Sequence, residues 1–210
     1  MNSTEYESIS IARSRYAGCC LACGICKILC YTICCRACRP ATQPKEELTL
    51  LCLGLEGAGK STLLAELAGE TVPEAEPTIG FSIKAVLMER VVLSVKELGG
   101  GPTIREYWER YFSGHDAVIF VIDSMSSDEQ LSESVTCLSR CLASSALRGL
   151  PVLVVCSKQD KTGSKSVDHV KAMVESVMDG RKWSIVGSSQ RGVEAVKKEL
   201  EEIANSIIDN

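Results

Sequence analysis

The sequence predicts an α/β fold, a mainly parallel six-stranded sheet with helices on both faces. Two observations predict it. Short apolar runs alternate along the chain with longer stretches in which apolar residues recur every three or four positions. Most of the short runs are apolar throughout, as strands buried on both faces are, and strands that alternate with helices form parallel sheets. A chain of 210 residues has room for one such domain and an additional segment.

The predicted elements follow one another without internal repeats. The six short apolar runs are predicted as strands: Leu48–Leu53, Ile83–Met88, Val91–Val95, Ala117–Ile122, Pro151–Cys156 and Trp183–Val186. The four amphipathic stretches are predicted as helices: Ser61–Leu67, Asp128–Leu142, Val167–Met178 and Val193–Ile208. Strand and helix alternate over most of this order, so we expect the carboxyl ends of the parallel strands to meet at one edge of the sheet.

A glycine-rich turn joins the first strand to the first helix. It matches the phosphate-binding pattern GxxxxGK(S/T), and its glycines allow backbone N–H groups to surround phosphate oxygens at the positive end of a helix. Lys60 is expected to reach the β- and γ-phosphates, and the Ser61 hydroxyl to hold Mg²⁺. A turn that merely linked two elements would not explain these two residues at a helix start. The predicted nucleotide contacts here are Gly54, Glu56, Gly57, Ala58, Gly59, Lys60, Ser61 and Thr62.

Three later segments follow in the order that a guanine-nucleotide site requires. Thr78 precedes the second strand, where its hydroxyl can join Mg²⁺. Glu97 lies at the end of the third strand, where an acid contacts the Mg²⁺ shell, and the Gly100 N–H is expected to meet the γ-phosphate. Lys158 and Asp160 follow the fifth strand, where a carboxylate can accept both hydrogen bonds from the N1 and N2 edge of guanine. Each segment alone also fits a turn or a solvated ion pair, but their common order predicts the site.

These segments resemble the Arf family of small GTPases. The resembling strings are Glu56–Ser61, Pro77–Phe81, Leu98–Gly100, Ile104-Arg105 with Trp108 and Tyr111-Phe112, Val121–Ser124 and Lys158–Asp160. The resemblance covers about residues 47–208 and implies a P-loop small-GTPase fold, with GTP or GDP and Mg²⁺ as cofactors. The strings Ile79–Val86 and Val95–Gly100 resemble one branch of the family. That branch implies a CBS-pair domain of a CNNM-type magnesium transport mediator as a candidate partner.

The chain departs from the pattern of the family at three functional positions. The family usually has a glutamine that orients the attacking water where this chain has Gly101, so we predict slow or absent intrinsic GTP hydrolysis. Glu97 stands in place of an aspartate and is one methylene longer, which is expected to alter the Mg²⁺ contact. Ser157 stands in place of an asparagine and is predicted to be too short to tether the base site to the phosphate loop. Gly187 and Ser188 match the small-residue turn of the family loosely and complete the predicted nucleotide contacts.

Two loops are expected to change with the bound nucleotide. The segments around Thr78 and over 100–111 would become ordered when γ-phosphate and Mg²⁺ hold them. By resemblance, effectors read the surface between these loops, and its candidate contact residues are Phe81, Ile83, Trp108 and Tyr111. For Phe81 and Trp108, ordinary core packing is an equally good interpretation.

The first 46 residues differ in composition from the rest. Residues 1–17 are polar and expected to be a flexible tail, 18–38 are apolar and cysteine-rich, and 39–46 contain two prolines and are expected to be a linker. The small-GTPase domain is predicted to span 47–210. Residues 1–45 carry a net charge of +4, so the remainder carries −8 of the total −4. This asymmetry predicts an anionic membrane as the partner of the tail, and the overall charge gives no indication of nucleic-acid binding.

The cysteine-rich segment admits three interpretations: S-palmitoylation, a zinc site with CxxC spacing, or a short transmembrane helix. We favour S-palmitoylation, because the intervals between the CxxC cysteines are mostly apolar, and Gly24 and Lys27 interrupt a span of marginal length. Asn2 stands where N-myristoylation needs a glycine. The predicted lipidation sites are Cys19, Cys20, Cys23, Cys26, Cys30, Cys34, Cys35 and Cys38. The remaining cysteines are expected to be small buried hydrophobic residues: Cys52, Cys137, Cys141 and Cys156.

The sequence thus predicts a GTP-binding switch on the cytoplasmic face of a Golgi, endosomal or plasma membrane. Its GTP-bound form would recruit an effector in vesicle traffic or in the regulation of a membrane protein. An alternative is a scaffold that binds nucleotide without cycling and holds a membrane-protein partner. Gly101, Glu97 and Ser157 favour this alternative more than the usual residues of the family would.

Overall fold

The computed structural model describes residues 45–72, 78–190 and 192–209. The predicted tail, the cysteine-rich segment with its eight cysteines, and most of the linker lie outside the described residues. The contacts of the chain group Lys45–Asn210 as one compact unit. In the described ranges, no helix is both long and apolar enough to cross a membrane.

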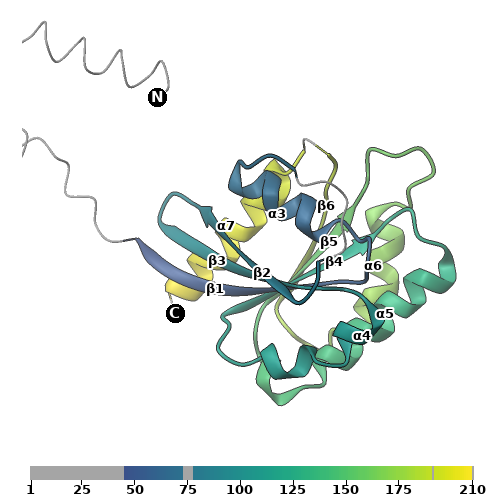
Figure 1. The fold of residues 1–210 in the computed structure, drawn as a ribbon, viewed down its shortest axis with the longest axis horizontal. Helices are drawn as coiled ribbons and strands as arrows, with labels where there is room; N and C mark the ends of the chain where they lie inside the picture. The colour runs from purple at the N-terminus through teal and green to yellow at the C-terminus, as the bar shows by residue number, and fades with distance from the viewer. Residues whose placement is uncertain (1–44, 73–77, 191, 210) are drawn as a thin grey trace, which may run out of the picture. The chain divides into compact units, whose positions relative to one another are not determined.

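A six-stranded sheet runs through the centre of this unit (Figure 1). Its strands are β1 (Glu46–Leu53), β2 (Phe81–Leu87), β3 (Val91–Leu98), β4 (Ala117–Asp123), β5 (Val152–Ser157) and β6 (Trp183–Gly187). Their spatial order is β2-β3-β1-β4-β5-β6. The β2–β3 pair is antiparallel and every other neighbouring pair is parallel. This arrangement confirms the mainly parallel six-stranded sheet that the sequence predicts.

Helices cover both faces of the sheet, as predicted. The helices are α3 (Lys60–Ala68), α4 (Pro102–Arg105), α5 (Asp128–Leu142), α6 (Val167–Glu175) and α7 (Glu194–Ile208). Two short 3₁₀ helices, η1 (Trp108–Tyr111) and η2 (Ser145–Leu147), complete the described elements. Apolar residues of α3 and α7 share one buried cluster, and those of α5 and α6 share the other. The last predicted turn of α6 is absent, because regular hydrogen bonding of that helix ends at Glu175.

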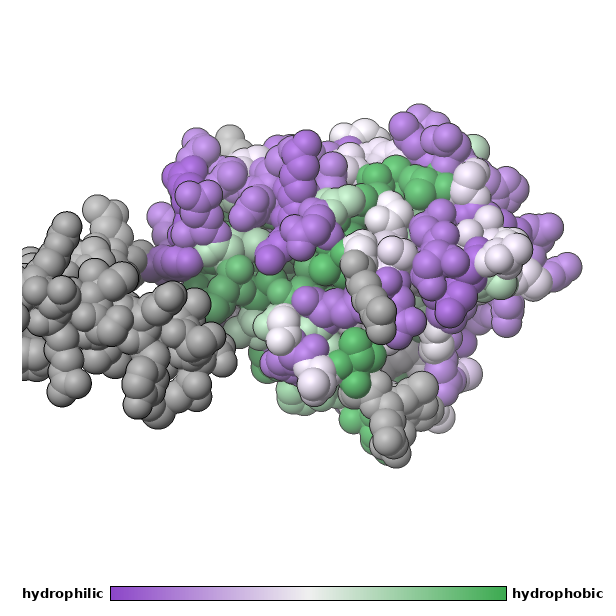
Figure 2. Space-filling model, turned by 90° about the horizontal axis from the view of Figure 1, so that it is seen from above, coloured by the Kyte–Doolittle hydropathy of each residue, from purple (hydrophilic) through white to green (hydrophobic). Residues whose placement is uncertain are grey.

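The edge strand β2 differs from the other strands because one of its faces is open. It pairs only with β3, and exposed side chains alternate along it with partly or fully buried ones. Phe81, Ile83 and Leu87 are 51%, 56% and 69% exposed. On the face of the molecule in Figure 2, green hydrophobic surface interrupts the purple hydrophilic side chains. The expectation that most strands are apolar on both faces therefore fails for β2.

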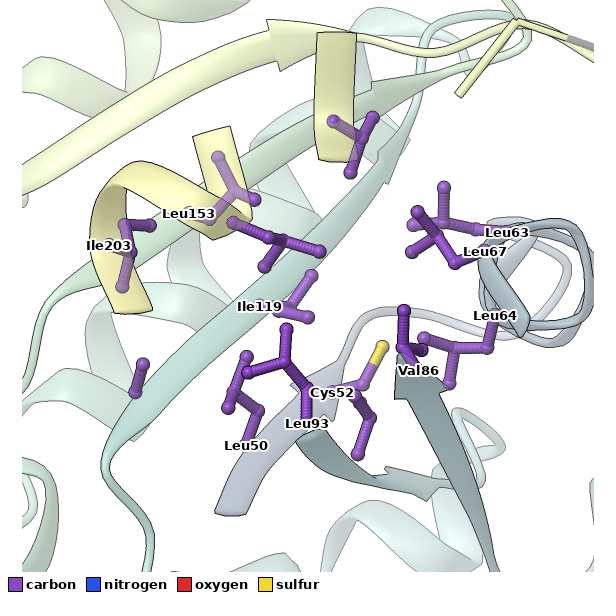
Figure 3. Packing of buried hydrophobic residues seen from close by; sticks show 14 of the residues in the cluster. Leu50, Cys52, Leu63, Leu64, Leu67, Val86, Leu93, Ile119, Leu153 and Ile203 are labelled. Carbon is purple, nitrogen blue, oxygen red and sulfur yellow. The ribbon is translucent and has the colours of Figure 1, made fainter. Parts of the chain in front are cut away.

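The central strands bury alternate side chains in the two clusters, which explains their continuous apolar runs. In β1, Leu50 and Cys52 face the first cluster, whereas Leu51 and Leu53 face the second. Figure 3 shows Leu50 and Cys52 in the first cluster together with residues of α3 and α7. The four cysteines of the described residues are all buried and free, as predicted: Cys52, Cys137, Cys141 and Cys156.

The parallel strands point their carboxyl ends toward the same edge of the sheet. The loops that follow β1, β4, β5 and β6 therefore meet there, and β3 ends beside them. In open α/β sheets, ligands bind outside this edge. The segments singled out in the sequence, at Gly54, Gly99, Ser157 and Gly187, all lie at it.

Candidate functional site

The loop between β1 and α3 passes too close to β4 for any side chain at its first position. Gly54 has a φ of 150°, and a Cβ added there would lie 2.4 Å from the Val121 carbonyl oxygen. At the other end of the loop, Gly59 is the N-cap of α3 and provides no side-chain cap. The first backbone N–H groups of α3 consequently remain available for an anion.

Lys60 is held inside this loop. The side chain is buried, and its ammonium donates hydrogen bonds to the carbonyl oxygens of Gly54, at 3.0 Å, and Leu55, at 2.9 Å. Burial lowers the pKa of Lys60, although the nearby Glu97 and Glu56 carboxylates oppose the shift. An ammonium has three N–H donors, so one remains for a phosphate oxygen.

The three predicted Mg²⁺ ligands come together from three segments. The Ser61 hydroxyl, at the start of α3, donates to Glu97 Oε1 at 2.6 Å and lies 3.1 Å from Thr78 Oγ1. Thr78 Oγ1 lies 3.4 Å from the same Glu97 oxygen. The longer side chain of Glu97 thus still reaches Ser61, although an aspartate is usual in the family.

This oxygen cluster fits a hard divalent cation. Glu97 is only 2% exposed, and within the described residues no ion pair is found for it. A buried carboxylate is costly without a positive partner. Magnesium prefers oxygen ligands and uses a few protein groups beside phosphates and waters. Ser61, Thr78 and Glu97 therefore have the chemistry to hold Mg²⁺ against a bound nucleotide.

The segment after β3 lies directly against the phosphate loop. A Cβ on Gly100 would lie 2.4 Å from the Leu55 carbonyl carbon and 2.5 Å from the Glu56 nitrogen, so only glycine permits this contact between backbones. Gly101, the next residue, has φ −65° and ψ 150° and is the N-cap of α4. Its backbone suits any residue, so the missing side chain there is not required by the conformation.

The base side of the predicted site is formed by the ends of β4, β5 and β6. Lys158 pairs with Asp123 at 2.5 Å, and the Gln159 amide donates to Ser124 Oγ at 2.6 Å. The Gln159 backbone N–H donates to the Ser188 carbonyl oxygen at 3.0 Å. Asp123, Ser124 and Gln159 are site residues beyond those predicted from the sequence, although each stands in a string that resembles the family. These contacts fix the predicted residues Lys158 and Ser188 beside one another.

Asp160 is oriented by backbone donors. Its carboxylate accepts a hydrogen bond from the Gln190 N–H at 3.3 Å and lies 3.6 Å from the Lys161 ammonium. Desolvation raises the pKa of Asp160, but hydrogen bonds from the Asp160 and Gln190 N–H groups and the Lys161 charge outweigh it and lower the pKa. The ionised carboxylate is the form that accepts two hydrogen bonds from a guanine edge.

The prediction that Ser157 is too short to reach the phosphate loop is wrong. Its hydroxyl lies 2.7 Å from the Ala58 carbonyl oxygen and 3.1 Å from that of Ile122, and it is buried. The side chain packs against the loop, since a Cβ added to Gly59 would be in ordinary van der Waals contact with Ser157 Oγ at 3.7 Å. The short side chain therefore joins the base side to the phosphate loop.

The predicted effector surface is present only in part. Phe81, Ile83 and Tyr111 are exposed, and the rings of Phe81 and Tyr111 have centroids 5.8 Å apart. For Trp108 the interpretation as ordinary core packing holds, because it is 3% exposed and its indole N–H donates to the Gly99 carbonyl oxygen at 2.8 Å. Sequence reasoning missed Ile79, which is 93% exposed and precedes β2 in one of the quoted strings.

Comparisons with known proteins find relatives over most of the chain. A model of the ADP-ribosylation factor family matches residues 35–207. ADP-ribosylation factor-like protein 15 of Bos taurus is 38% identical over 185 residues, covering 87% of this chain and 90% of the relative. The Mus musculus protein of that name is 39% identical, covering 84% and 87%. This is the branch of the family that the strings Ile79–Val86 and Val95–Gly100 resemble.

More distant relatives share the fold. ADP-ribosylation factor-like protein 3 of Chlamydomonas reinhardtii is 37% identical over 165 residues, covering 78% of this chain and 92% of the relative. Among solved structures, the Arl6 BBS3 small GTPase from Trypanosoma brucei, with the bound nucleotide analogue GppNp, is 23% identical. It aligns with a TM-score of 0.68 over 78% of this chain and 98% of that chain.

Proposed function

The chain belongs to the ADP-ribosylation factor family of small GTPases, and on this basis we propose that it is a membrane-anchored switch that holds GTP, hydrolyses it slowly and recruits an effector. The observation that carries the proposal is the assembled site. Lys60 lies in the phosphate loop, and the oxygens of Ser61, Thr78 and Glu97 lie within 3.4 Å of one another beside it.

Each group in the site has a distinct part in binding. The phosphate loop and Lys60 would hold the β- and γ-phosphates, and Ser61, Thr78 and Glu97 would hold Mg²⁺, which would offset the phosphate charge. Asp160 accepts the hydrogen bonds of guanine, and the Lys158 stem lies beside it. Titration with labelled GTP, GDP and ATP tests this assignment. Tight, Mg²⁺-dependent binding of both guanine nucleotides over ATP is expected, and equal affinity for ATP would contradict it.

Slow hydrolysis follows from Gly101, which has no side chain to orient the attacking water. We expect single-turnover hydrolysis by the isolated protein to be slower than that of an Arf protein with glutamine at this position. A partner protein can still supply a catalytic group in trans. A rate equal to that of the glutamine-bearing protein would remove this part of the proposal.

The switch requires that the effector distinguish the two nucleotide states. The rival function is a scaffold that does not cycle between GTP and GDP. Gly101 favours this rival. Ser157 no longer favours it, because the Ser157 hydroxyl reaches the phosphate loop. Binding of a candidate partner, a CBS-pair domain of a CNNM-type magnesium transport mediator, is to be measured with GTP-loaded and GDP-loaded protein. Equal affinities would support the scaffold, because a ligand without differential affinity shifts no equilibrium. A preference for the GTP-loaded form supports the switch.

Membrane anchoring rests on the cysteine-rich segment 18–38. Palmitoyl chains on two or more of its cysteines would give stable attachment to the cytoplasmic face of a Golgi, endosomal or plasma membrane, beside a basic stretch. Hydroxylamine-sensitive acyl labelling in cells tests this. Labelling should be lost when the eight cysteines are changed to serine, and labelling that persists would place the anchor elsewhere.

A further inference from the structure

The carboxylate of Glu56 occupies the space in front of Gly101. A Cβ added to Gly101 would have Glu56 Oε2 at 3.6 Å, and no other atom beyond its chain neighbours within 4 Å in the described residues. The region that a side chain at position 101 would enter is therefore open on its other sides. Glu56 itself is an exposed residue of the phosphate loop, so its carboxylate is free to meet solvent there.

Glu56 also belongs to the loop that is expected to surround the phosphates. Gly100 packs against the backbone of Leu55 and Glu56, which keeps the segment after β3 beside the loop. The negative charge of Glu56 also acts on Lys60, since it raises the pKa of that ammonium against the effect of burial. Lys60 is the residue expected to reach the outer phosphates. Glu56 thus lies in the phosphate loop with its carboxylate beside the position where a water-orienting side chain is missing.

We propose that Glu56 is the positioning residue for the attacking water in this chain, in place of a side chain at position 101. This inference rests on the proposed GTP binding and slow hydrolysis. The carboxylate accepts a hydrogen bond from the water, whose oxygen attacks the γ-phosphorus. The bond from the γ-phosphorus to the bridging oxygen breaks, and GDP leaves with its electron pair. The products are GDP, inorganic phosphate and one proton, which passes to the phosphate or to solvent.

A carboxylate is an incomplete replacement for a glutamine. Its oxygens accept hydrogen bonds but cannot donate one to a phosphate oxygen, as the amide of a glutamine does. Its charge also repels the γ-phosphate. Positioning by Glu56 therefore makes GTP hydrolysis faster than the uncatalysed reaction in water, while the rate stays low.

Two substitutions of similar size separate positioning from mere bulk. Glu56→Leu removes the acceptor and Glu56→Gln keeps one, and single-turnover hydrolysis is measured with Mg²⁺ at saturating protein. We expect Glu56→Leu to slow hydrolysis about ten- to a hundredfold, the range for a lost hydrogen bond to a charged group, and Glu56→Gln to retain much of the rate. Glu89→Leu, an exposed glutamate in the β2–β3 turn, is the matched control and should leave the rate unchanged.

A second cycle tests whether position 101 and Glu56 act on the same water. Gly101→Gln should raise the rate, and Glu56→Leu should then cost less in that background than alone, because coupled residues are not additive. Three results would each overturn the inference. The first is that Glu56→Leu hydrolyses GTP as fast as the wild type or faster, and the second is that Glu56→Leu and Glu56→Gln lose equal rate. The third is that the wild type hydrolyses GTP no faster than the uncatalysed reaction. Other results would contradict the proposed switch instead of the role of Glu56. These are a wild-type protein that does not bind GTP, or an effector that does not prefer the GTP-loaded form.

Discussion

The Ser157 hydroxyl joins two halves of the nucleotide site with a single atom. Its single proton lies between the buried carbonyl oxygens of Ala58, at 2.7 Å, and Ile122, at 3.1 Å, and Ser157→Ala removes this donor. If the bond is intact only in the bound form, the free energy of nucleotide binding should weaken by roughly 0.5–1.5 kcal/mol. This corresponds to about two- to tenfold faster nucleotide dissociation. Stopped-flow release of a fluorescent GDP analogue measures this rate.

Ser184 provides the matched control. Its hydroxyl is buried at the start of β6 and has no hydrogen-bond partner among the described residues. Ser184→Ala removes the same atoms without removing a bond, so GDP release should stay unchanged. Dissociation from Ser157→Ala at the wild-type rate would show that the tether carries no binding energy.

Gly100 joins the segment after β3 to the phosphate loop. A methyl group there would lie 2.4–2.5 Å from three backbone atoms of the loop, and backbone cannot move aside as a flexible side chain can. Gly100→Ala should therefore prevent this contact, and with it the γ-phosphate contact of the Gly100 N–H. We expect GTP affinity to fall at least about tenfold, whereas GDP affinity is retained.

Gly114→Ala is the control for this substitution. An added Cβ at Gly114 meets nothing within 4 Å, although its φ of 80° makes alanine strained there. It tests whether a general loss of stability, rather than the contact, changes the ratio of the two affinities. A GTP-to-GDP affinity ratio that is the same in Gly100→Ala and wild type would contradict the assigned role.

Helix α5 begins with a capping box. The Ser127 hydroxyl accepts from the Gln130 N–H at 3.3 Å, and the Gln130 side chain accepts from the Ser127 N–H at 3.1 Å. Ser127→Ala should lower the free energy of unfolding by about 1 kcal/mol, as measured by urea denaturation. Ser144→Ala is the control, since Ser144 precedes η2 without a side-chain cap bond and should change stability far less. Equal losses in both variants would refute the cap assignment.

The sequence predicts those elements well whose period repeats several times. Helix α5 has the predicted bounds, because its apolar face and its capping box agree. Helix α4 and η1 were not predicted, since four residues cannot show a 3.6-residue period. Strand β3 was predicted to end at Val95, because Lys96 and Glu97 interrupt the apolar run. The strand nevertheless continues, since both residues keep ladder partners in β1. That interruption occurs where the strand supplies a site residue.

The sequence predicted those residues of the candidate site that stand in recognisable motifs. The motif residues gather at one edge because parallel strands end there. Ser157 was misjudged because the reach of a side chain depends on where folding places the two segments, which residue identity does not reveal. Trp108 could not be placed for a similar reason, since its partner is a backbone carbonyl at Gly99. The proximity of Glu56 to Gly101 has no sequence signal, because it arises from the packing of two loops.

The charge of the whole chain is divided between its parts. Residues 1–45 carry +4, and the rest of the chain carries −8. Basic residues near an anionic leaflet contribute about 1 kcal/mol each, whereas an acidic domain is repelled. We therefore expect the unacylated chain to bind phosphatidylserine vesicles at low ionic strength. A variant in which the six basic residues of 1–45 are changed to glutamine should bind far less in co-sedimentation.

Salt separates this electrostatic contribution from acylation. The Debye length falls from about 10 Å at 0.1 M to about 3 Å at 1 M, so binding through charge alone should be lost as salt rises. Burial of palmitoyl chains depends on apolar area and is not screened, so the acylated protein isolated from cells should remain on vesicles at 1 M salt. Loss of both forms from the membrane at high salt would mean that the tail binds by charge alone and that the cysteines are not its anchor.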